Sequence, residues 1–301
     1  MSAVTSRITR IEALRNEPLR KHTSWRVGGP ADLFYAPTSI AELRSVLADL
    51  PATTAIHWLG LGSNLLVRDG GIRGAVIATS SLPRDLERLD DRRVRASAGL
   101  ACMLLAKRCV RWQLGPAAFF AGIPGTVGGA LAMNAGAFGG ETWTHVEAVT
   151  TIDRRGTVRE RPRADFEIGY RTVRGATDEW FLGATFRFDH DEASSMDAIK
   201  EMLARRNAAQ PLGVPSCGSV FRNPEGDFAG RLIEQAGLKG RRIGGAMVSD
   251  KHANFILNVA DATAADIEAL IAEVRAAVEK TSGVHLELEV RVVGEPAGGQ
   301  V

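Results

Sequence analysis

Glycine density between residues 121 and 140 is the feature that most constrains how this chain folds. The segment reads AGIPGTVGGALAMNAGAFGG. Glycine makes up 32 of the 301 residues, above the average of about 7%, and much of the excess lies here. Small uncharged residues at this density favour a flat surface on which a second body lies closely, because glycine permits close backbone approach. That body is either a bound ligand or a neighbouring strand of the same protein.

A second glycine loop, Gly60 to Asn64, lies between two apolar segments that predict strands, Ala55–Leu59 and Leu65–Val67. Backbone N–H groups of such a loop can converge on an anion. The loop lacks the third glycine of the dinucleotide fingerprint and the lysine of the P-loop, so alone it predicts either a phosphate site or a tight turn. Two glycine loops in one chain favour a large phosphate-bearing cofactor.

Composition and charge exclude several classes of protein. Lys and Arg number 37 and Asp and Glu 35, a formal net charge of +2, which gives no reason to expect nucleic acid as a partner. No stretch approaches the roughly 20 apolar residues of a membrane span, and residues 1–20 lack the apolar run of a signal peptide. The three cysteines lack zinc-site spacing. We therefore expect a cytoplasmic protein without membrane insertion, disulfides or bound metal.

Apolar periodicity and capping signals predict a mixed α and β chain of two or three domains. Ser39 to Glu42 is a capping box, and Gly283 stops a helix over Ile267–Val278 that has a weaker cap signal from Thr263 to Asp266. Strict alternation predicts a strand over His285–Val292, and the acidic segment Asp189–Ser195 predicts a linker. The other expected helices are Leu100–Trp112, Met196–Ala208 and one near Phe228–Gln235, and the other expected strands are Ala75–Ala78, Val94–Ala98, Val146–Ile152 and Trp180–Phe188.

Several motifs, in a fixed order, resemble the UDP-N-acetylenolpyruvoylglucosamine reductase family, in the form that lacks an extra tyrosine-bearing lid. The resemblance runs from about Leu19 to Gly294, nearly the whole chain. The motifs are VGGPAD at 27–32, GLGSNLLV at 60–67, AGIPGTVGGALAMNAGAFGGE at 121–141, GYR at 169–171, GSVFRNP at 218–224, AGLKG at 236–240, SDKHANF at 249–255 and LELEV at 286–290.

The resemblance implies an α+β fold of the vanillyl-alcohol-oxidase (PCMH) type. Two subdomains, 1–85 and 86–195, are expected to hold FAD non-covalently, and a C-terminal α+β domain, 196–301, to bind the substrate. NADPH is implied as the co-substrate, and UDP-N-acetylglucosamine enolpyruvate as the nucleotide-sugar substrate that is reduced to UDP-N-acetylmuramate for cell-wall synthesis. The residues expected to bind FAD are Gly60, Leu61, Gly62, Ser63, Asn64, Gly122, Ile123, Pro124, Gly125, Thr126, Gly129, Asn134 and Gly136.

Three catalytic residues follow from the matched motifs. Ser219 matches the family's proton donor, Arg171 the residue that binds and polarises the enolpyruvyl carboxylate, and Glu289 a terminal glutamate that assists it. Alternation places Glu287 on the same strand face as Glu289, and only the motif match distinguishes them. The family pattern has a serine two residues after the arginine, where this chain has Val173. Expected substrate contacts are Tyr170, Asn223, Lys239, Lys251 and His252.

Other functions remain open at this point. The chain is alternatively an FAD oxidase of the same fold, a non-catalytic module that binds flavin or a nucleotide sugar, or a structural protein whose glycine loops serve packing alone. Ser219 is alternatively an ordinary turn residue, Arg171 a surface ion-pair residue, and His252 a structural histidine. Cys217 stands next to Gly218-Ser219, and packing is preferred over a redox role.

Overall fold

A computed structural model describes residues 11–175 and 177–298, and its two units do not follow the order of the chain. Within the described residues, one unit contains 11–14, 34–60 and 75–203, and the other contains 15–33, 61–74 and 204–298. The predicted division into 1–85, 86–195 and 196–301 differs from this, because its first segment contributes to both units and residues 196–203 lie in the 75–203 unit. Residues 1–10 lie outside the described chain. Below, the units are called the 75–203 unit and the 204–298 unit.

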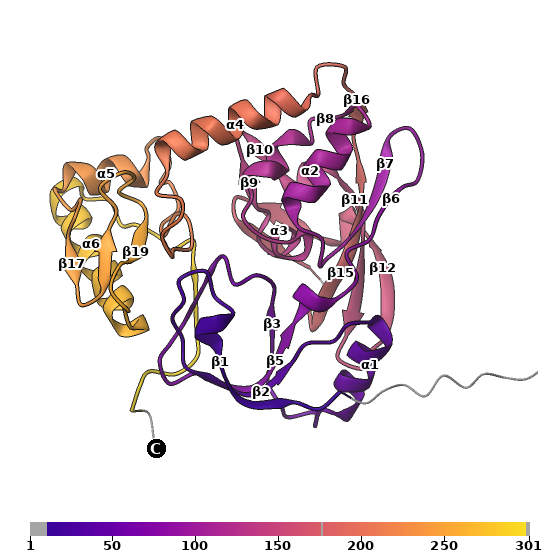
Figure 1. Cartoon of the computed structure of the whole chain (residues 1–301), viewed down its shortest axis with the longest axis horizontal. Helices are drawn as coiled ribbons and strands as arrows, with labels where there is room; N and C mark the ends of the chain where they lie inside the picture. Colours follow the sequence, from indigo (N-terminus) through magenta and orange to yellow (C-terminus); the bar gives the residue numbers. More distant parts are fainter. Residues whose placement is uncertain (1–10, 176, 299–301) are drawn as a thin grey trace, which may run out of the picture. The chain divides into compact units, whose positions relative to one another are not determined.

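The 75–203 unit is built on a five-stranded antiparallel sheet (Figure 1). Its order is β12 (Val158–Pro162), β11 (Val146–Asp153), β15 (Glu179–Arg187), β7 (Arg93–Ser97) and β6 (Leu86–Arg88). The helices α2 (Cys102–Arg111) and α3 (Val127–Met133) follow β7 in the chain. Helix α1 (Ile40–Asp49) begins at the predicted cap, where the Ser39 side chain accepts a hydrogen bond from the Glu42 N–H.

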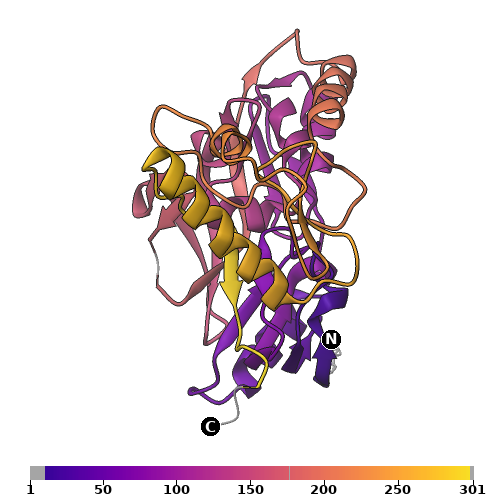
Figure 2. The same ribbon diagram turned by 90° about the vertical axis from the view of Figure 1, so that its left-hand side faces the viewer.

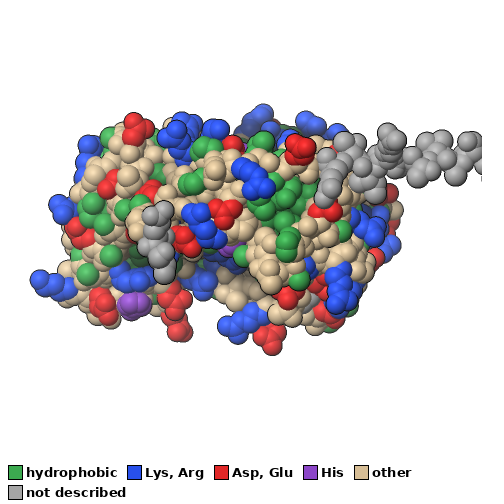
Figure 3. Space-filling model, turned by 90° about the horizontal axis from the view of Figure 1, so that it is seen from below, with side chains coloured by type: hydrophobic (Ala, Val, Ile, Leu, Met, Phe, Trp, Pro, Cys, Tyr) green, Lys and Arg blue, Asp and Glu red, His purple; other side chains and the backbone are tan. Residues whose placement is uncertain are grey.

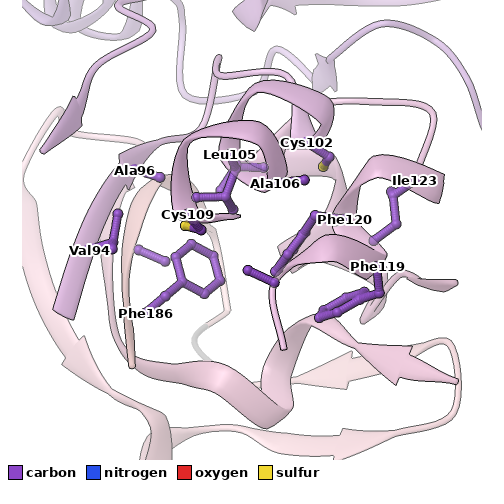
Figure 4. Packing of buried hydrophobic residues seen from close by; sticks show 14 of the residues in the cluster. Val94, Ala96, Cys102, Leu105, Ala106, Cys109, Phe119, Phe120, Ile123 and Phe186 are labelled. Atoms are coloured by element: carbon purple, nitrogen blue, oxygen red, sulfur yellow. The ribbon is translucent and has the colours of Figure 1, made fainter. Parts of the chain in front are cut away.

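The core of this unit lies between α2 and the sheet (Figure 4). Cys102, Leu105 and Cys109 share one face of α2, as their helical spacing predicts, and are fully buried. They pack with Phe120 and Phe186, whose rings meet edge to face at 5.5 Å. Burial of such side chains stabilises a fold by about 1.5–3 kcal/mol each.

Short strand pairs complete the 75–203 unit. Two of them lie at the site described below: β9 (Gly136–Ala137) with β10 (Gly140–Glu141), and β13 (Glu167–Gly169) with β14 (Thr172–Arg174). The third is β8 (Leu114–Gly115) with β16 (Asp189–His190). Short 3-10 helices lie at Thr79–Ser81, Ala118–Gly122, Thr142–His145 and Arg163–Asp165 in this unit, and at Leu19–Lys21 in the other. Helix α4 (Met196–Ala209) leads from this unit into the other.

A four-stranded sheet has the order β1 (Leu14–Pro18), β2 (Pro30–Tyr35), β5 (Ile72–Ala78) and β3 (Ile56–Leu59). The chain passes from one unit to the other within β1, within β2 and within β5. Strands β3 and β5 are parallel, and the glycine loop at 60–64 directly follows β3.

The 204–298 unit contains the longest helix, α6 (Ala264–Ser282), and β20 (Arg291–Val293), drawn in gold and yellow in Figure 2. Helix α5 (Ala229–Gln235) and the sheet β17 (Arg242–Ile243), β18 (Ala246–Val248) and β19 (Ile256–Asn258) complete it. Strand β20 pairs in parallel with β4 (Leu65–Val67). The buried Trp25 indole donates to the Ile256 carbonyl at 2.7 Å, which ties residues 15–33 to this unit.

Helix α6 is fixed at both ends by groups that the sequence signals. Thr263 and Asp266 form a reciprocal capping box. Asp69, from the β4–β5 turn, adds a second cap, since its carboxylate accepts the N–H groups of Ala264 and Ala265 at 2.9 Å. Gly283 ends the helix in the left-handed conformation, with φ of 71°.

Two predictions from the sequence are wrong. His285–Val292 is not one strand: β20 begins at Arg291, and the preceding residues make a single bridge, between Leu288 and Phe221, because no continuous partner strand lies beside them. The alternation holds in burial only, with Leu286 and Val290 in the core. Asp189–Ser195 is no loose linker, since β16 pairs with β8 and the Asp191 N–H donates to the Gln113 carbonyl.

Acidic and basic side chains are interspersed over the face drawn in Figure 3, in agreement with the small net charge. Within residues 11–175 and 177–298, no helix combines the length and apolar character needed to traverse a bilayer.

Candidate functional site

In the loop at 61–64, which belongs to the 204–298 unit, backbone carbonyls accept hydrogen bonds from other parts of the same unit. The Gly62 carbonyl accepts the Ser24 N–H at 3.1 Å, and the Asn64 carbonyl accepts the Arg291 N–H at 3.0 Å. Gly62 has φ of 61°, and a Cβ there would collide with the His22 carbonyl, so glycine is required at this position. The Asn64 amide donates to the Glu289 carbonyl at 3.0 Å.

The N–H side of the same loop is different. The N–H groups of Leu61, Gly62 and Ser63 donate to no other group of the described chain, and Leu61 is 48% exposed. Three successive N–H groups on a loop whose carbonyls are engaged elsewhere have the chemistry of an anion-binding nest. The loop therefore fits a phosphate of a dinucleotide cofactor.

Cys217 packs beneath this loop. Its thiol lies 3.6 Å from the Gly62 carbonyl and 3.5 Å from the Leu65 carbonyl, and it is 4% exposed. Burial raises the pKa of the Cys217 thiol to about 12, so the thiol stays protonated and serves as a weak donor. This arrangement favours the packing role predicted for Cys217.

In the glycine-rich segment of the 75–203 unit, several backbone N–H groups are hydrogen-bonded within the unit. The N–H groups of Val127 and Gly128 donate to the carbonyls of Leu100 and Ala98 at 2.8 and 2.9 Å, and the Thr126 hydroxyl caps α3 by accepting the Gly129 N–H. The Gly129 α-carbon is open, because a Cβ there would meet only the Thr126 hydroxyl, at 3.8 Å.

Residues 122–125 of this segment mostly pack within the protein or lie beside the helix cap. The Ile123 side chain is 7% exposed and belongs to the core, and a Cβ at Gly122 would collide with the Phe138 ring. Pro124 is exposed and Gly125 half-buried, next to the cap residue Thr126. A ligand on this surface therefore meets backbone and small side chains, as the composition predicts.

Asn134 ends α3 in the left-handed conformation, with φ of 47°, and is 1% exposed. Its amide donates to the Glu141 carboxylate at 2.9 Å and to the Gly169 carbonyl at 3.1 Å, and accepts the Trp143 N–H at 3.0 Å. The structure thus directs the side chain of this expected FAD contact toward its own protein.

Arg171 and Tyr170 form the two-residue turn between β13 and β14. Arg171 has φ of 52°, a conformation that costs a non-glycine residue about 1–2 kcal/mol. Its guanidinium donates to the Asn134 and Gly136 carbonyls at 3.3 and 3.2 Å and lies 4.9 Å from the centre of the Tyr170 ring. An arginine held at a position that suits glycine points to a function of its side chain.

Gly136 is small because the backbone carbonyl of Gly140 lies against it. A Cβ at Gly136 would collide with that carbonyl, and would also be 3.2 Å from Arg171 Nη1 and Glu141 Cγ. This glycine, an expected FAD contact, thus has a packing role within the protein.

In the 204–298 unit the segment that follows Ser219 is hydrogen-bonded to the segment that contains Glu289. The Glu289 N–H donates to the Val220 carbonyl at 2.8 Å, and the Arg222 N–H donates to the Glu287 carbonyl at 2.9 Å. The Ser219 side chain is half-buried and makes no hydrogen bond to the described residues. The Glu289 side chain is half-buried, whereas that of Glu287 is 72% exposed.

The expected substrate residues of this unit have varied surroundings. The Asn223 amide oxygen accepts the Ala229 N–H at the start of α5. Lys239 pairs with Glu234 at 2.6 Å, and Lys251 donates to the Asn207 carbonyl at 2.5 Å. Burial lowers the pKa of His252, whose ring packs 4.9 Å from that of Phe255.

Two polar residues, one buried and one half-buried, were not singled out from the sequence as supports of the site. Asn254 is 3% exposed and exchanges two hydrogen bonds, at 3.0 and 2.8 Å, with the backbone of Phe221, close to Ser219. Glu141 holds the Asn134 amide. Both stand inside the matched motifs, but only their three-dimensional partners reveal what they do. In the described part of the chain, no group of three or more His, Cys, Asp or Glu is arranged to hold a metal ion.

Comparison with known proteins matches both halves of the chain. A family model described as "FAD binding domain" matches residues 31–161, and one described as "UDP-N-acetylenolpyruvoylglucosamine reductase, C-terminal domain" matches residues 210–293. The UDP-N-acetylenolpyruvoylglucosamine reductase of Alkalilimnicola ehrlichii is 53% identical over 296 residues, 98% of this chain and 99% of that protein. The protein of the same name from Methylococcus capsulatus is 55% identical over 283 residues, 94% of this chain and 93% of its own length.

A solved structure gives the same result. The crystal structure of UDP-N-acetylenolpyruvylglucosamine reductase from Thermus caldophilus has a TM-score of 0.77 and 32% identity, covering 94% of this chain and 98% of that one. The predicted α+β class, with an FAD-binding domain and a C-terminal reductase domain, is confirmed.

Proposed function

Because the chain belongs to the UDP-N-acetylenolpyruvoylglucosamine reductase family and is an FAD oxidoreductase, we propose that it reduces UDP-N-acetylglucosamine enolpyruvate to UDP-N-acetylmuramate in the cytoplasm, with NADPH as the hydride source. The observation that carries the proposal is the match of both domains over nearly the whole chain. The hydrogen bond from the Glu289 N–H to the carbonyl of Val220, the residue after Ser219, supports it, because the two segments lie far apart in the sequence.

FAD fits the glycine loops. We propose that the N–H groups of Leu61, Gly62 and Ser63 bind its phosphates, and that the surface at 122–129, open at Gly129, lies against it. Bound FAD would supply the hydride carrier between NADPH and the enolpyruvyl double bond.

The substrate chemistry defines what the protein must provide. Hydride addition to the terminal carbon of the enolpyruvyl group leaves negative charge on the carbon next to the carboxylate. That charge spreads into the carboxylate, and a proton must then reach the carbon. The protein must therefore stabilise charge at the carboxylate and deliver a proton.

We assign these roles to the three predicted catalytic residues. The Arg171 guanidinium is proposed to bind the carboxylate, since its planar fork suits two carboxylate oxygens and two backbone carbonyls, of Asn134 and Gly136, hold the side chain in place. The Ser219 hydroxyl is proposed to donate the proton; a hydroxyl not engaged by the protein is available to a ligand. Glu289 is proposed to assist at the carboxylate.

An anaerobic spectrum of the purified protein tests the function. The protein should be yellow, lose its colour on addition of NADPH, and regain it when the enolpyruvyl nucleotide is added. Flavin should be released on denaturation, as expected of a non-covalent cofactor and unlike a tethered oxidase. A colourless protein, or a bleached one that the enolpyruvyl nucleotide leaves bleached, would refute the proposal.

A further inference from the structure

One side chain joins the turn that carries Arg171 to the glycine-rich segment. The Asn134 amide donates to the carbonyl of Gly169, the residue that opens the Tyr170–Arg171 turn. The backbone carbonyl of Asn134, which is not part of that side chain, accepts a hydrogen bond from the guanidinium of Arg171. Asn134 therefore holds the backbone of the turn with its side-chain amide, and it contacts the Arg171 side chain with its backbone carbonyl.

Asn134 is itself strongly restrained. Its left-handed backbone conformation and its almost complete burial fix the direction of the side chain, and Glu141 and the Trp143 N–H hold the two ends of the amide. An amide has two N–H donors, and both are used, one on Glu141 and one on the turn. A buried amide in this network cannot rotate without leaving polar groups unsatisfied.

We propose that Asn134 is a positioning residue for Arg171, and that Glu141 supports it, so that the substrate-binding arginine and the flavin-binding segment move as one body. This inference rests on the proposed function of Arg171. It departs from the sequence-based expectation that the Asn134 side chain contacts FAD.

The backbone conformation of Arg171 also favours such a clamp. Arg171 occupies the left-handed region, which costs free energy in a non-glycine residue and persists where the surrounding contacts hold it. A flexible arginine in a relaxed turn would present its guanidinium in many directions. Positioned charge binds and polarises a carboxylate far better than mobile charge, so the clamp should contribute to substrate binding and to the oxidative half-reaction, and not to reduction by NADPH.

The test is a double-mutant cycle on the holoenzyme. Asn134→Gly keeps a residue that tolerates positive φ and removes the amide. It is combined with Arg171→Ala, and each protein is assayed for flavin content, melting temperature, the rate of bleaching by NADPH, and the dissociation constant of the enolpyruvyl nucleotide from its perturbation of the flavin spectrum. Thr142→Val is the matched control, because it removes a buried hydrogen bond to the Ala135 carbonyl in the same segment without touching the turn.

Asn134→Gly should weaken nucleotide binding about tenfold or more, as expected for loss of a buried hydrogen bond, with NADPH bleaching within about twofold of wild type. In the Arg171→Ala background the same change should add less than about twofold, because it acts through the arginine. Thr142→Val should lower the melting temperature and leave the dissociation constant unchanged.

Three results would overturn the inference. The first is that Asn134→Gly and Arg171→Ala change the nucleotide dissociation constant independently, so that their factors multiply. The second is that Asn134→Gly mainly causes loss of FAD or of bleaching by NADPH, and the third is that Thr142→Val weakens nucleotide binding as much as Asn134→Gly does. If Asn134→Gly does not fold, Glu141→Ala, which removes one acceptor of the amide, should weaken nucleotide binding in the same Arg171-dependent way, and an unchanged constant would count against the clamp. A wild-type protein that fails to bind the nucleotide would instead refute the proposed function.

Discussion

Replacing Ser219 by alanine is expected to separate catalysis from stability. The Ser219 hydroxyl makes no hydrogen bond to the described chain and is only half-buried, so its loss should change the free energy of unfolding by no more than about 0.5 kcal/mol. As the proton donor, the same hydroxyl should contribute about 100- to 10,000-fold to the step in which substrate is reduced. This corresponds to about 3–5.5 kcal/mol of barrier.

Rapid mixing without oxygen measures the two half-reactions separately. In Ser219→Ala, bleaching by NADPH should proceed at the wild-type rate, and the return of colour with the enolpyruvyl nucleotide should be slowed by the factor above. Ser219→Cys, which keeps an ionisable hydrogen, should recover part of the rate. Ser216→Ala is the matched control, since Ser216 is a half-buried serine of the same loop. Reoxidation of Ser219→Ala within about threefold of wild type would refute the assignment.

Arg171→Lys should weaken binding of the enolpyruvyl nucleotide about tenfold or more, because a lysine cannot hold the carboxylate with a planar fork; an unchanged titration would remove the arginine from the site. Glu289→Gln should lower turnover at least about tenfold, whereas Glu287→Gln, at an exposed side chain, should not; equal small effects would exclude Glu289. Burial raises the pKa of the Cys217 thiol to about 12 from 9.0, so the thiol keeps its proton in the folded state and loses it in the unfolded state as pH rises above about 9. The free energy of unfolding, measured with urea, should therefore fall between pH 9 and 11, and it should fall less steeply in Cys217→Ala. A maleimide should not modify the thiol of the native protein at pH 8, and rapid labelling would contradict this. Asp69→Ala removes two hydrogen bonds from the start of α6 and should lower the free energy of unfolding by about 1–2 kcal/mol, with Asp69→Asn intermediate; a change under about 0.3 kcal/mol in urea unfolding would show that water replaces the cap.

Local signals predicted the helices well because their causes lie within a few residues. Ser39 caps α1, and the pair Thr263 and Asp266 caps α6 as expected. The strand predicted at His285–Val292 failed because a strand needs a partner, and alternation of side chains records burial without recording pairing. Here the segment has one bridge, to Phe221, and becomes a strand only where β4 accompanies it.

The candidate site depends on long-range contacts, and only part of it could be predicted from the sequence. Motif matches supplied Arg171, Ser219 and Glu289, whose roles stay predictions. Nothing in the local pattern indicates that Asn134 reaches the Gly169 carbonyl, 35 residues away. Such a partner is set by how β9, β10 and the β13–β14 turn are placed, and therefore by the whole unit.

The glycine loops combine the two interpretations that their composition allows, ligand surface and internal packing. Gly62 and Gly136 are small because the backbone carbonyls of His22 and Gly140 lie against them, which is packing. The same close packing engages the carbonyls of the 61–64 loop and leaves the N–H groups of its first three residues without a protein partner among the described residues. Gly129 faces open space. Without side chains, a backbone can be hydrogen-bonded to the protein on one side and accessible to a phosphate on the other. The glycines that allow close packing therefore also make a ligand surface possible. The two interpretations are compatible.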